Sequence, residues 1–384
     1  MKIVHVLGIV SPDGSYGGPA RVALDQTRAL LDAGYDVTLV AGAIGFGKLP
    51  PKNFDGVPVH LFPAHRLVPR SGFAGLVAPG LTRWLANRLR RDVDLLHVHL
   101  ARDLITLPAA AQGALARKRL VVQPHGMIER SQNPFAGPLD SLATKRVLRY
   151  AEKVFHLTNE EKRELSMVAG RPLPFTQLSN GIASREIVVS EPQPRLEVLF
   201  LARMHSRKRP VAFVQMAEKL HKLYPDVNFR LVGPDEGEGN LVDAAIAKAA
   251  MGDRLRWEGP LEPAATSRRF AQSSIYVLPA VNEPFGMTIL EAMTQGKPVV
   301  VTETCGIAGR ISNANAGIIV NGDVDSMATA VAALLSDSTL RESLGKNARA
   351  LAGDFGMSPV VKTLADAYTE TVAIPPNEFK DLND

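Results

Sequence analysis

The hydrophobic positions of this chain alternate between short runs rich in β-branched residues and longer stretches in which apolar residues recur at helical spacing. An apolar run at residues 2–10 predicts the first strand, and a helical apolar pattern over residues 19–33 predicts the first helix. Gly34 ends this helix, and a second apolar run at residues 36–40 predicts the next strand. A strand, a helix and a further strand in this order are typical of a doubly wound α/β sheet.

The same alternation continues along the rest of the chain. Further strands are predicted at residues 57–62, 94–100, 120–123, 154–157, 175–178, 197–201, 228–232, within 253–260, at 274–278 and at 298–302. Further helices are predicted at residues 81–91, 104–118, 139–153, 159–168, from 210 onward, and at 285–295, 325–336, 340–352 and 359–372. Residues 302–311 are expected to form a glycine-containing loop.

A polar stretch with two prolines, residues 183–194, separates two such series of strands and helices. A chain of 384 residues also exceeds the size of one ordinary domain. The sequence therefore predicts two Rossmann-like domains at residues 1–182 and 195–357, joined by that linker. A helix at residues 358–372 and a polar tail at residues 373–384 complete the chain.

Composition narrows the class of protein. Apolar residues make up 46% and charged residues 22% of the chain, and no stretch approaches the ~18 consecutive apolar residues of a membrane span. Cys305 is the only cysteine, which excludes a disulfide framework and a thiolate metal cluster. The first segment has the pattern of a strand and lacks that of a signal peptide. Together these features predict a cytoplasmic globular protein.

The net charge of +5 is divided unevenly, with +9 in residues 1–182 and −4 in residues 183–384. A basic first half favours an anionic partner such as a phospholipid surface, a lipid diphosphate or a nucleic acid. The sequence contains no zinc finger, no helix-turn-helix cue and no interleaving of aromatic with basic residues, so a nucleic acid is excluded as the expected partner.

One predicted helix, residues 81–91, carries much of this basic charge. Its apolar positions lie on one face, and arginines 83, 88, 90 and 91 occupy others. Basic amphipathic helices of this kind lie on anionic membranes, which would place the protein peripherally on the inner face of the membrane. The alternative is an ordinary helix that covers a sheet and exposes its arginines to solvent.

The stretch with the most specific chemistry is Glu-Pro-Phe-Gly-Met-Thr-Ile-Leu-Glu, from Glu283 to Glu291. It joins a strand to a helix, so the backbone N–H groups of Phe285, Gly286, Met287 and Thr288 are the unpaired donors at a helix start. Such a helix start at the carboxyl end of a strand is a ready anion site, and phosphate is its commonest guest. Carboxylates on either side of it suggest sugar or ribose hydroxyls as partners. The alternative is that Glu283 caps the helix and Glu291 is an exposed helical charge.

Two further groups could contact phosphates. Gly17 and Gly18 lie between the first strand and the first helix, where glycines let backbone approach a phosphate, although a plain tight turn is the alternative. The pair is not a G-x-G-x-x-G fingerprint, which removes the main support for an NAD enzyme. Arg203 and Lys208 follow a strand of the second half and can converge on a diphosphate, unless they belong to a solvated loop.

Three histidines also lie in or just after predicted strands. His125 precedes Gly126 at the carboxyl end of a parallel strand, where chemistry is placed in this architecture, and a purely structural hydrogen-bonding histidine is the alternative. His97 and His99 point to the same side of a strand and could suggest a metal. Because no carboxylate or cysteine is spaced to join them, buried structural histidines are favoured.

These motifs occur in a characteristic order: Gly17-Gly18, His125-Gly126, Asn180-Gly181, Arg203 with Lys208, and Glu283 with Glu291. In this order and spacing the chain resembles the large family of retaining, nucleotide-sugar-dependent glycosyltransferases with the GT-B fold, over nearly its whole length. The resemblance implies two Rossmann-like domains facing each other across a cleft. It also implies that the last helix returns to the first domain, and it requires no metal or other cofactor.

The family's site residues carry over to matching positions. The resemblance implies that Arg203 and Lys208 neutralise the leaving nucleoside diphosphate, and that Glu283 holds hydroxyls of the donor sugar. Glu291 would bind the ribose hydroxyls, and His125 would hydrogen-bond the sugar. Gly17 and Gly18 would face the donor phosphates, Gly233 would lie near the nucleotide, and Arg256 and Trp257 are the candidates nearest the base. Arg209 replaces the glycine that usually follows the family's lysine, which leaves the local turn and its own role open.

The expected activity is therefore transfer of a hexose-type sugar from a nucleoside diphosphate to a hydroxyl of a glycan or lipid-linked acceptor, with retention of configuration. Two alternatives remain: an epimerase or disaccharide synthase on the same fold, and a catalytically silent nucleotide-sugar-binding protein. The intact pairs of cations and of glutamates argue against the silent protein. The sequence leaves open the base (UDP, GDP or ADP), the sugar and the acceptor.

Overall fold

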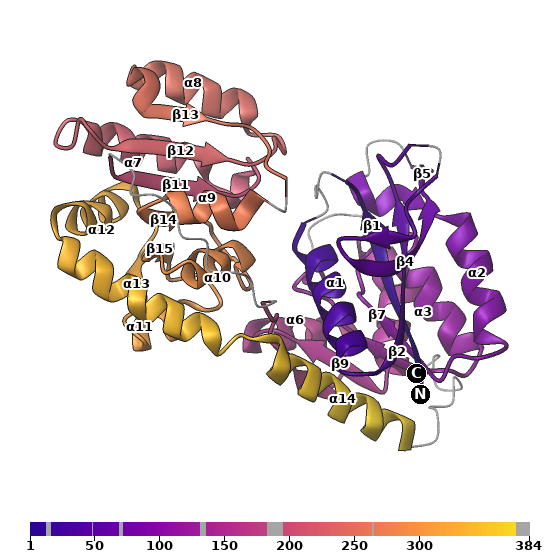
Figure 1. The fold of residues 1–384 in the computed structure, drawn as a ribbon. Helices are drawn as coiled ribbons and strands as arrows, with labels where there is room; N and C mark the ends of the chain where they lie inside the picture. Colours follow the sequence, from indigo (N-terminus) through magenta and orange to yellow (C-terminus); the bar gives the residue numbers. More distant parts are fainter. Residues whose placement is uncertain are drawn as a thin grey trace. The chain divides into compact units, whose positions relative to one another are not determined.

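The computed structural model describes residues 1–12, 17–47, 49–68, 72–130, 136–182, 195–262 and 265–373. It divides into two compact units, unit 1 formed by Met1–Ala183 with Met357–Asp384, and unit 2 formed by Ser184–Gly356 (Figure 1). The linker predicted at residues 183–194, and all but the first residue of the tail predicted at 373–384, lie outside the described residues.

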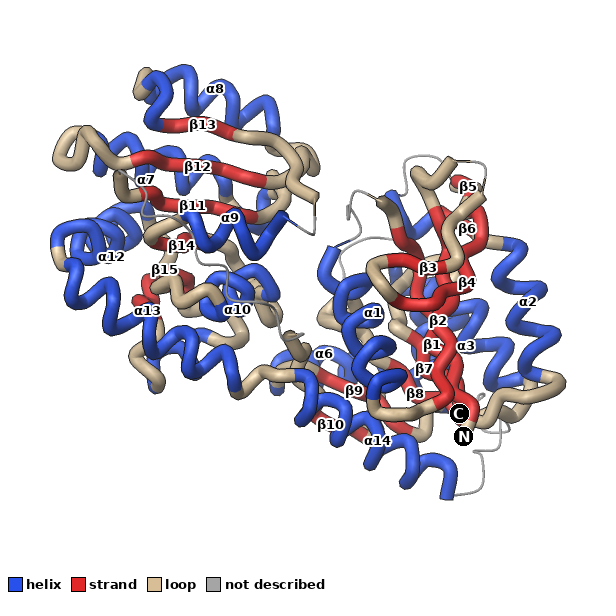
Figure 2. Tube along the Cα trace, viewed as in Figure 1, coloured by secondary structure: helices blue, strands red, loops and turns tan. Residues whose placement is uncertain are grey.

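Unit 1 is built on a mostly parallel sheet (Figure 2). Its strands are β1 (Lys2–Val10), β2 (Asp36–Ala43), β3 (Asn53–Phe54), β4 (Val57–Pro63), β5 (His65–Arg66), β6 (Leu76–Val77), β7 (Leu95–Val98), β8 (Arg119–Val122), β9 (Lys153–His156) and β10 (Phe175–Gln177). Eight of them form one sheet in the order β10-β9-β8-β7-β1-β2-β4-β3, in which β3 alone runs antiparallel to its neighbour, while β5 and β6 form a separate antiparallel pair.

Its helices are α1 (Gly17–Asp32), α2 (Pro79–Leu89), α3 (Thr106–Leu115), α4 (Ala136–Leu139), α5 (Lys145–Tyr150), α6 (Asn159–Ala169) and α14 (Met357–Ala373), with a 3-10 turn at Gly72–Gly75 and a π-helical turn at Asp140–Thr144. The single helix predicted at residues 139–153 is therefore three consecutive pieces, α4, the π-helical turn and α5.

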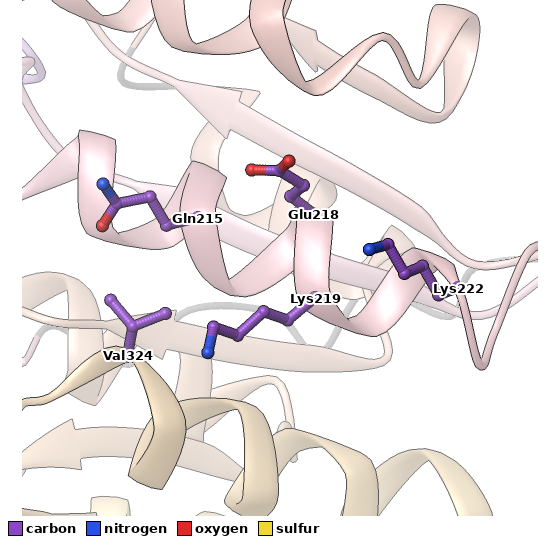
Figure 3. A pocket seen from close by; sticks show the side chains of 5 residues that line it. All are labelled: Gln215, Glu218, Lys219, Lys222 and Val324. Carbon is purple, nitrogen blue, oxygen red and sulfur yellow. The ribbon is translucent and has the colours of Figure 1, made fainter.

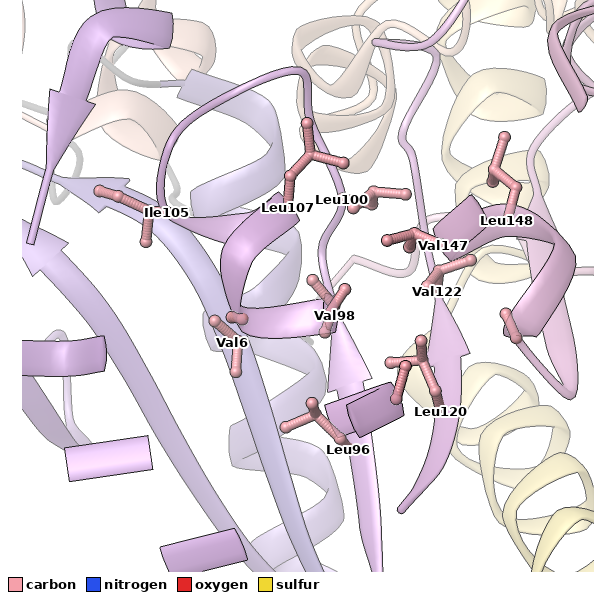
Figure 4. Packing of buried hydrophobic residues seen from close by; sticks show 14 of the residues in the cluster. Val6, Leu96, Val98, Leu100, Ile105, Leu107, Leu120, Val122, Val147 and Leu148 are labelled. Atoms are coloured by element: carbon pink, nitrogen blue, oxygen red, sulfur yellow. The ribbon is translucent and has the colours of Figure 1, made fainter. Parts of the chain in front are cut away.

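Alternating residues of the central strands enter two different cores, because successive side chains of a strand point to opposite faces. One face packs against α2, α3 and α5, as Figure 4 shows for Val6, Leu96, Val98, Leu120 and Val122. The opposite face packs against α1 and α14, whose side chains Leu30, Val360, Leu364 and Tyr368 are buried there. Helix α14 therefore belongs to the core of unit 1 although it is the last helix of the described chain.

Unit 2 is a second parallel sheet with helices on both sides. Its strands are β11 (Glu197–Leu201), β12 (Asn228–Val232), β13 (Leu255–Trp257), β14 (Ile275–Leu278), β15 (Val299–Thr302) and β16 (Gly317–Val320), in the order β13-β12-β11-β14-β15-β16. Its helices are α7 (Pro210–His221), α8 (Gly239–Ala249), α9 (Thr266–Gln272), α10 (Met287–Thr294), α11 (Ala308–Asn313), α12 (Val324–Ser336) and α13 (Ser338–Gly353), with 3-10 turns at Ser206–Lys208 and Gly252–Arg254.

The predicted mixed α/β class is confirmed, and most differences concern short elements. The loop predicted at residues 302–311 is wrong in its second half, where α11 begins at Ala308. The strands β3, β5, β6 and β16 and the helix α9 were not predicted. Helices α12 and α13 begin where the carboxylates of Asp323 and Asp337 accept hydrogen bonds from backbone N–H groups of the first turn.

Helix α2 covers the sheet with its apolar face. Leu81, Leu85 and Leu89 are buried in the core, and Arg88 pairs with Asp92 while its guanidinium lies 5.5 Å from the ring centre of Trp84. The packing supports the sheet-covering alternative, because the leucines that would enter a membrane are already inside the protein. Among the described residues, no helix combines the length and the hydropathy needed to span a membrane.

Candidate functional site

The loop between β14 and α10 places Glu283 at the carboxyl end of the sheet of unit 2. One carboxylate oxygen, Oε1, accepts a hydrogen bond from the backbone N–H of Gly286 at 3.1 Å. Gly286 has φ of 75°, and a Cβ there would lie 2.4 Å from Cδ1 of Ile289, so a larger residue at this turn would be strained and would displace the Ile289 side chain. This bond goes to the residue before the first turn of α10, so it does not confirm the alternative that Glu283 caps the helix. It takes up the N–H of Gly286, which was predicted to be unpaired, and the other oxygen of Glu283 remains for a charged partner.

That partner is Lys208, whose ammonium group forms an ion pair with Oε2 of Glu283. The two side chains are only 19% and 13% exposed, so the pair is largely shielded from solvent. Arg203 is also paired, with Glu236, but these two side chains are 41% and 39% exposed. Both predicted diphosphate-binding cations thus face carboxylates of their own unit, and only the Lys208 pair is shielded enough to be strong.

Arg209 has a structural role that the sequence did not indicate. It adopts a left-handed backbone conformation, with φ of 55°, which is the conformation that a glycine at this position would favour. Its guanidinium reaches across the strand ends and donates a hydrogen bond to the carbonyl oxygen of Gly322 at 2.6 Å, with the carbonyl of Pro279 at 3.5 Å. The departure from the family pattern therefore keeps the turn geometry and adds a tie between neighbouring loops.

Gly233 and Trp257 lie together at the ends of β12 and β13. The indole N–H of Trp257 donates to the carbonyl oxygen of Gly233 at 2.9 Å. Gly233 has φ of 142°, and a Cβ there would lie 2.0 Å from the carbonyl oxygen of Ala202, so only glycine fits. Arg256 points away from this pair, since neighbouring residues of a strand alternate between faces, and it pairs with the exposed carboxylate of Asp253. The structure brings Gly233 and Trp257 together and does not bring Arg256 to them.

Glu291 is buried on α10, with 7% of its surface exposed, so the alternative of an exposed helical charge is wrong. It is the fifth residue of α10, little more than one turn inside the helix, whereas the helix predicted from residue 285 would place it about two turns inside. Phe285 is also buried and packs edge-to-face on Phe355 with 5.6 Å between ring centres. Its side chain thereby anchors the loop.

Tyr276 was not predicted as a site residue, and its hydroxyl holds the start of α10 in place. Its hydroxyl hydrogen-bonds the hydroxyl of Thr288 at 2.8 Å and the carbonyl oxygen of Leu201 at 3.1 Å. Burial raises the pKa of Tyr276, and the negative charges of Glu283 and Glu291 add to this effect. The tyrosine stays neutral and fixes Thr288, the second residue of α10. A tyrosine inside the buried run of β14 was the available signal, because a buried hydroxyl needs a partner.

In unit 1, His125 follows β8 in a left-handed turn, with φ of 56° at His125 and 72° at Gly126. The buried carboxylate of Glu161 holds this turn by accepting hydrogen bonds from the backbone N–H groups of Gly126 at 2.5 Å and Leu157 at 2.6 Å. Burial lowers the pKa of His125 to about 3, so its imidazole is neutral near pH 7. Its Nδ1 is buried without a hydrogen-bond partner among the described residues, while Nε2 bonds His99.

The glycine pair lies at the start of α1, which begins at Gly17, two residues earlier than predicted. Among the described residues, apart from the chain neighbours of Gly18 and the backbone of its own helix, no atom lies within 4 Å of the position that a Cβ of Gly18 would take. Residues 13–16 of the glycine-rich loop lie outside the described residues.

Side chains that could ligate a metal occur at two kinds of position. Among the described residues, the one group able to ligate a metal is His5, His97 and His99, all buried. Two Asp-x-Asp triplets, residues 92–94 and 323–325, also occur in the chain and could hold a metal in principle. Their carboxylates instead form ion pairs or cap α12: Asp92 with Lys2 and Arg88, Asp94 with the backbone of Lys2, Asp323 with Ser326, and Asp325 with Lys219.

Two hollows on the surface lie apart from these residues. One of about 300 Å³ lies beside α7 and is lined by Gln215, Glu218, Lys219, Lys222 and Val324 (Figure 3). The other, of about 440 Å³, lies where α2 and α3 begin, and its lining is mostly apolar: Val77, Pro79, Thr82, Arg83, Ala86, Leu104, Pro108 and Gln112. Neither contains a residue predicted for nucleotide or sugar binding.

Comparison with known families divides the chain into two matching regions. Residues 17–181 match the Glycosyl transferase 4-like domain, and residues 185–351 match the Glycosyl transferases group 1 family. Among curated relatives, D-inositol 3-phosphate glycosyltransferase of Kribbella flavida is 27% identical over 62% of this chain and 61% of its own length. D-inositol 3-phosphate glycosyltransferase 2 of Catenulispora acidiphila is 26% identical over 96% of this chain and 94% of its own length.

Solved structures share the fold at lower sequence identity. Sucrose-phosphate synthase of Thermosynechococcus elongatus superimposes with a TM-score of 0.77 at 18% identity, covering 97% of this chain and all of that one. Alr3699/HepE of Anabaena, solved in complex with UDP-glucose, superimposes with a TM-score of 0.73 at 19% identity, covering 96% of this chain and all of that one. These neighbours assign the GT-B fold to the chain.

Proposed function

The chain belongs to the group 1 glycosyltransferases, and we propose that it moves a hexose-type sugar from a nucleoside diphosphate sugar to a hydroxyl of a glycan or lipid-linked acceptor, with retention of configuration. The observation that carries the proposal is the shielded ion pair of Lys208 with Glu283 beside the start of α10. A cation for phosphate, a carboxylate for sugar hydroxyls and a helix N-terminus lie there on two neighbouring loops at the carboxyl ends of the strands.

The proposed reaction breaks the bond between the anomeric carbon and the diphosphate oxygen and forms a bond from that carbon to the acceptor oxygen. The acceptor's proton passes to a phosphate oxygen of the leaving group, so no protein base is assigned. Lys208, Arg203 and the backbone N–H groups at the start of α10 stabilise the charge that develops on the diphosphate. This proposal needs no metal ion and no cofactor besides the donor substrate.

The remaining residues would position the donor. When the donor binds, Glu283 would give up its ion pair with Lys208 and accept hydrogen bonds from hydroxyls of the sugar. Glu291 would bind the ribose hydroxyls from its buried place on α10. Gly233 and Trp257 would lie near the nucleotide, and His125 would contact the sugar through its buried Nδ1. Gly17 and Gly18 would allow close approach of backbone at the start of α1.

For the acceptor, the mostly apolar hollow at the start of α2 and α3 supports a lipid-linked molecule, and Arg83 at its edge could pair with a phosphate of such a molecule. Association with an anionic membrane would then be electrostatic and would use the exposed arginines of α2, because the leucines of that helix are buried. If liposomes bind equally well when Arg83, Arg90 and Arg91 are replaced by serine, this part of the proposal fails.

The donor site is tested by thermal-shift binding against UDP, GDP, ADP and their common sugar conjugates. UDP-glucose is the first to try, because Alr3699/HepE was solved with it. A ligand that binds only the folded state raises its melting temperature, so one base should stabilise the protein and Glu291→Ala should abolish the shift. If no nucleotide produces a shift, the donor site is refuted and the silent binding protein becomes the better hypothesis.

Release of free nucleoside diphosphate separates a transferase from an epimerase on the same fold. The assay would combine the stabilising donor with candidate acceptors, beginning with D-inositol 3-phosphate, the acceptor named for both curated relatives. Release that depends on an acceptor supports transfer. Interconversion of the donor sugar without release would identify an epimerase instead.

A further inference from the structure

Unit 1 buries four histidines and a tyrosine in one continuous chain of hydrogen bonds. His125 Nε2 lies 2.8 Å from His99 Nδ1, and His99 Nε2 lies 3.2 Å from His5 Nδ1. His5 Nε2 lies 3.0 Å from the hydroxyl of Tyr368, which also lies 2.6 Å from His97 Nδ1. These residues come from β1, β7 and its end, the end of β8, and α14, and His125 is the most exposed of them, at 8%.

We propose that His99, His5 and Tyr368 are positioning residues that fix which ring nitrogen of His125 carries its proton and hold its Nδ1 ready to accept a hydrogen bond from a sugar hydroxyl. This inference rests on the proposed function, because it assumes that His125 contacts the donor sugar. It adds three residues, one of them on the last described helix, to the group that determines how the sugar is held.

All four imidazoles of this hydrogen-bond chain are neutral. Burial lowers the pKa of His5 and of His125 to about 3. Burial also lowers the pKa of His97 and His99 well below the usual value, and the neighbouring histidines lower both further. A neutral imidazole has one N–H donor and one bare acceptor nitrogen. Each contact between two rings therefore needs an N–H on one side and a bare nitrogen on the other.

This condition makes the protons interdependent. If the Tyr368 hydroxyl donates to His5 Nε2, the proton of His5 must be on Nδ1, and the same follows for His99 and His125. The hydroxyl oxygen then accepts from Nδ1 of His97. If the hydroxyl donates to His97 Nδ1 instead, all four histidines carry their proton on Nε2. Both arrangements satisfy every contact, and in both the four rings share one tautomer.

The contact distances favour the second arrangement. O–H donors make shorter hydrogen bonds than N–H donors, and the Tyr368 hydroxyl is closer to His97 than to His5. The hydroxyl therefore donates to His97, and His125 carries its proton on Nε2. Its Nδ1 is then a bare acceptor, buried and without a partner among the described residues, and a sugar hydroxyl is the kind of donor that it would accept.

The same cluster could be taken for a metal site, and the geometry argues against it. One nitrogen of each of His5, His97 and His99 lies within 4.8 Å of the others, but the rings of His97 and His99 stack with 17° between their planes and 4.6 Å between centres. Both nitrogens of His5 are already used, one by His99 and one by Tyr368. The hydrogen-bond chain accounts for these contacts directly.

The proposal is tested first on the free protein, by long-range proton–nitrogen NMR of protein labelled with 15N-histidine. Protonated and bare ring nitrogens have different shifts, and single histidine variants assign the signals. We expect His5, His97, His99 and His125 to be protonated on Nε2. Mixed tautomers among these four in the native protein would overturn the proposal. So would a stoichiometric metal in the purified protein with metal-shifted nitrogens, which would establish a metal site.

The second test removes the hydroxyl that joins His5 to His97. Tyr368→Phe deletes one hydroxyl and leaves the ring, so we expect mixed tautomers and a fall in kcat/KM for the sugar donor of up to about tenfold, the usual effect of one hydrogen bond. Binding of the free nucleoside diphosphate should not change, because it carries no sugar. Tyr150→Phe is the matched control: Tyr150 is also buried in unit 1 and bonds the carbonyl oxygen of Lys118 at 3.3 Å.

A third pair of variants separates positioning from packing. His99→Asn keeps a polar group near the place of Nδ1 and should retain more activity than His99→Leu. Uniform tautomers, together with unchanged kcat/KM in Tyr368→Phe and in His125→Ala, would mean that the chain exists and that the assumed sugar contact of His125 is wrong. Mixed tautomers in the native protein, together with a large loss of kcat/KM in His125→Ala, would mean that His125 contacts the sugar without this hydrogen-bond chain.

Discussion

The shielded ion pair leads to a prediction in which two properties move in opposite directions. Glu283→Gln removes the charge of the carboxylate and keeps an oxygen that can accept the hydrogen bond from the backbone N–H of Gly286. Lys208 then has no anionic partner in the loop. We therefore expect free nucleoside diphosphate to bind the variant more tightly, because its phosphates no longer compete with Glu283 for Lys208, and sugar transfer to become slower.

The size of the effect follows from the burial of the pair. Opposite charges 4 Å apart interact with about 4 kcal/mol at an effective dielectric constant of about 20, before the cost of removing them from water. With side chains 19% and 13% exposed, the usual value for a charge-assisted hydrogen bond, about 1.5 to 3 kcal/mol, is more realistic. Since about 1.4 kcal/mol corresponds to a tenfold change, the dissociation constant of the nucleoside diphosphate should fall about tenfold or more.

Isothermal titration calorimetry with the nucleotide identified by thermal shift measures this change, and release of nucleoside diphosphate in the presence of acceptor measures transfer. Transfer should fall by about 100-fold, because a group that orients the reacting sugar is lost. Glu236→Gln is the matched control: its ion pair with Arg203 is about 40% exposed, so binding should change by less than about threefold. Unchanged or weaker nucleotide binding in Glu283→Gln would refute the competition between the carboxylate and the diphosphate.

Other features give shorter predictions. Gly233→Ala should lower the free energy of unfolding by about 3 kcal/mol or more, because its Cβ would meet the carbonyl oxygen of Ala202; an unchanged melting temperature would contradict the crowding. Arg209→Gly should relieve about 1 to 2 kcal/mol of backbone strain and lose a similar amount with the hydrogen bond to Gly322. The free energy of unfolding and the nucleotide affinity should therefore change little. A tenfold loss of affinity would show that Arg209 binds the diphosphate. Because the folded pKa of His5 and of His125 lies near 3, below the unfolded value of about 6.5, their contribution to stability is complete above pH 6.5 and is lost as the pH falls toward 3. Urea unfolding at pH 7 and pH 5 should therefore differ by roughly 2 kcal/mol for each of these two histidines, and equal stabilities at both values would contradict their neutral burial.

Much of the fold could be predicted because parallel strands buried on both faces are continuous apolar runs that end at glycine or proline. Strand β1 has the bounds that its sequence pattern predicted, Lys2–Val10. The elements that were missed are short and depend on packing. Helix α11 has six residues and only Ala308 and Ile311 buried, too few for a helical period to appear in the sequence.

The site was predictable in its parts and not in its pairings. The spacing of Glu283 and Glu291 along the sequence identified the loop and the helix correctly. Arg203 and Lys208 are five residues apart, so their proximity depends only on the local turn between them. The ion pair of Lys208 with Glu283 joins residues 75 positions apart, on different loops of the sheet. Sequence spacing fixes which residues reach the carboxyl ends of the strands, but the choice of partner among them depends on side-chain distances in the folded protein.

The pairing also has a consequence for donor recognition. Lys208 cannot serve a diphosphate without releasing Glu283, and a shielded carboxylate without a partner is costly. Free nucleoside diphosphate offers Glu283 nothing in return, whereas a complete sugar nucleotide supplies hydroxyls as well as phosphates. The intact donor should therefore bind the native protein more tightly than the free nucleoside diphosphate. In Glu283→Gln this preference should shrink, because the diphosphate no longer leaves a charge unpaired. The carboxylate would thus favour both binding of the donor and release of the spent nucleotide, since the ion pair re-forms once the sugar is gone.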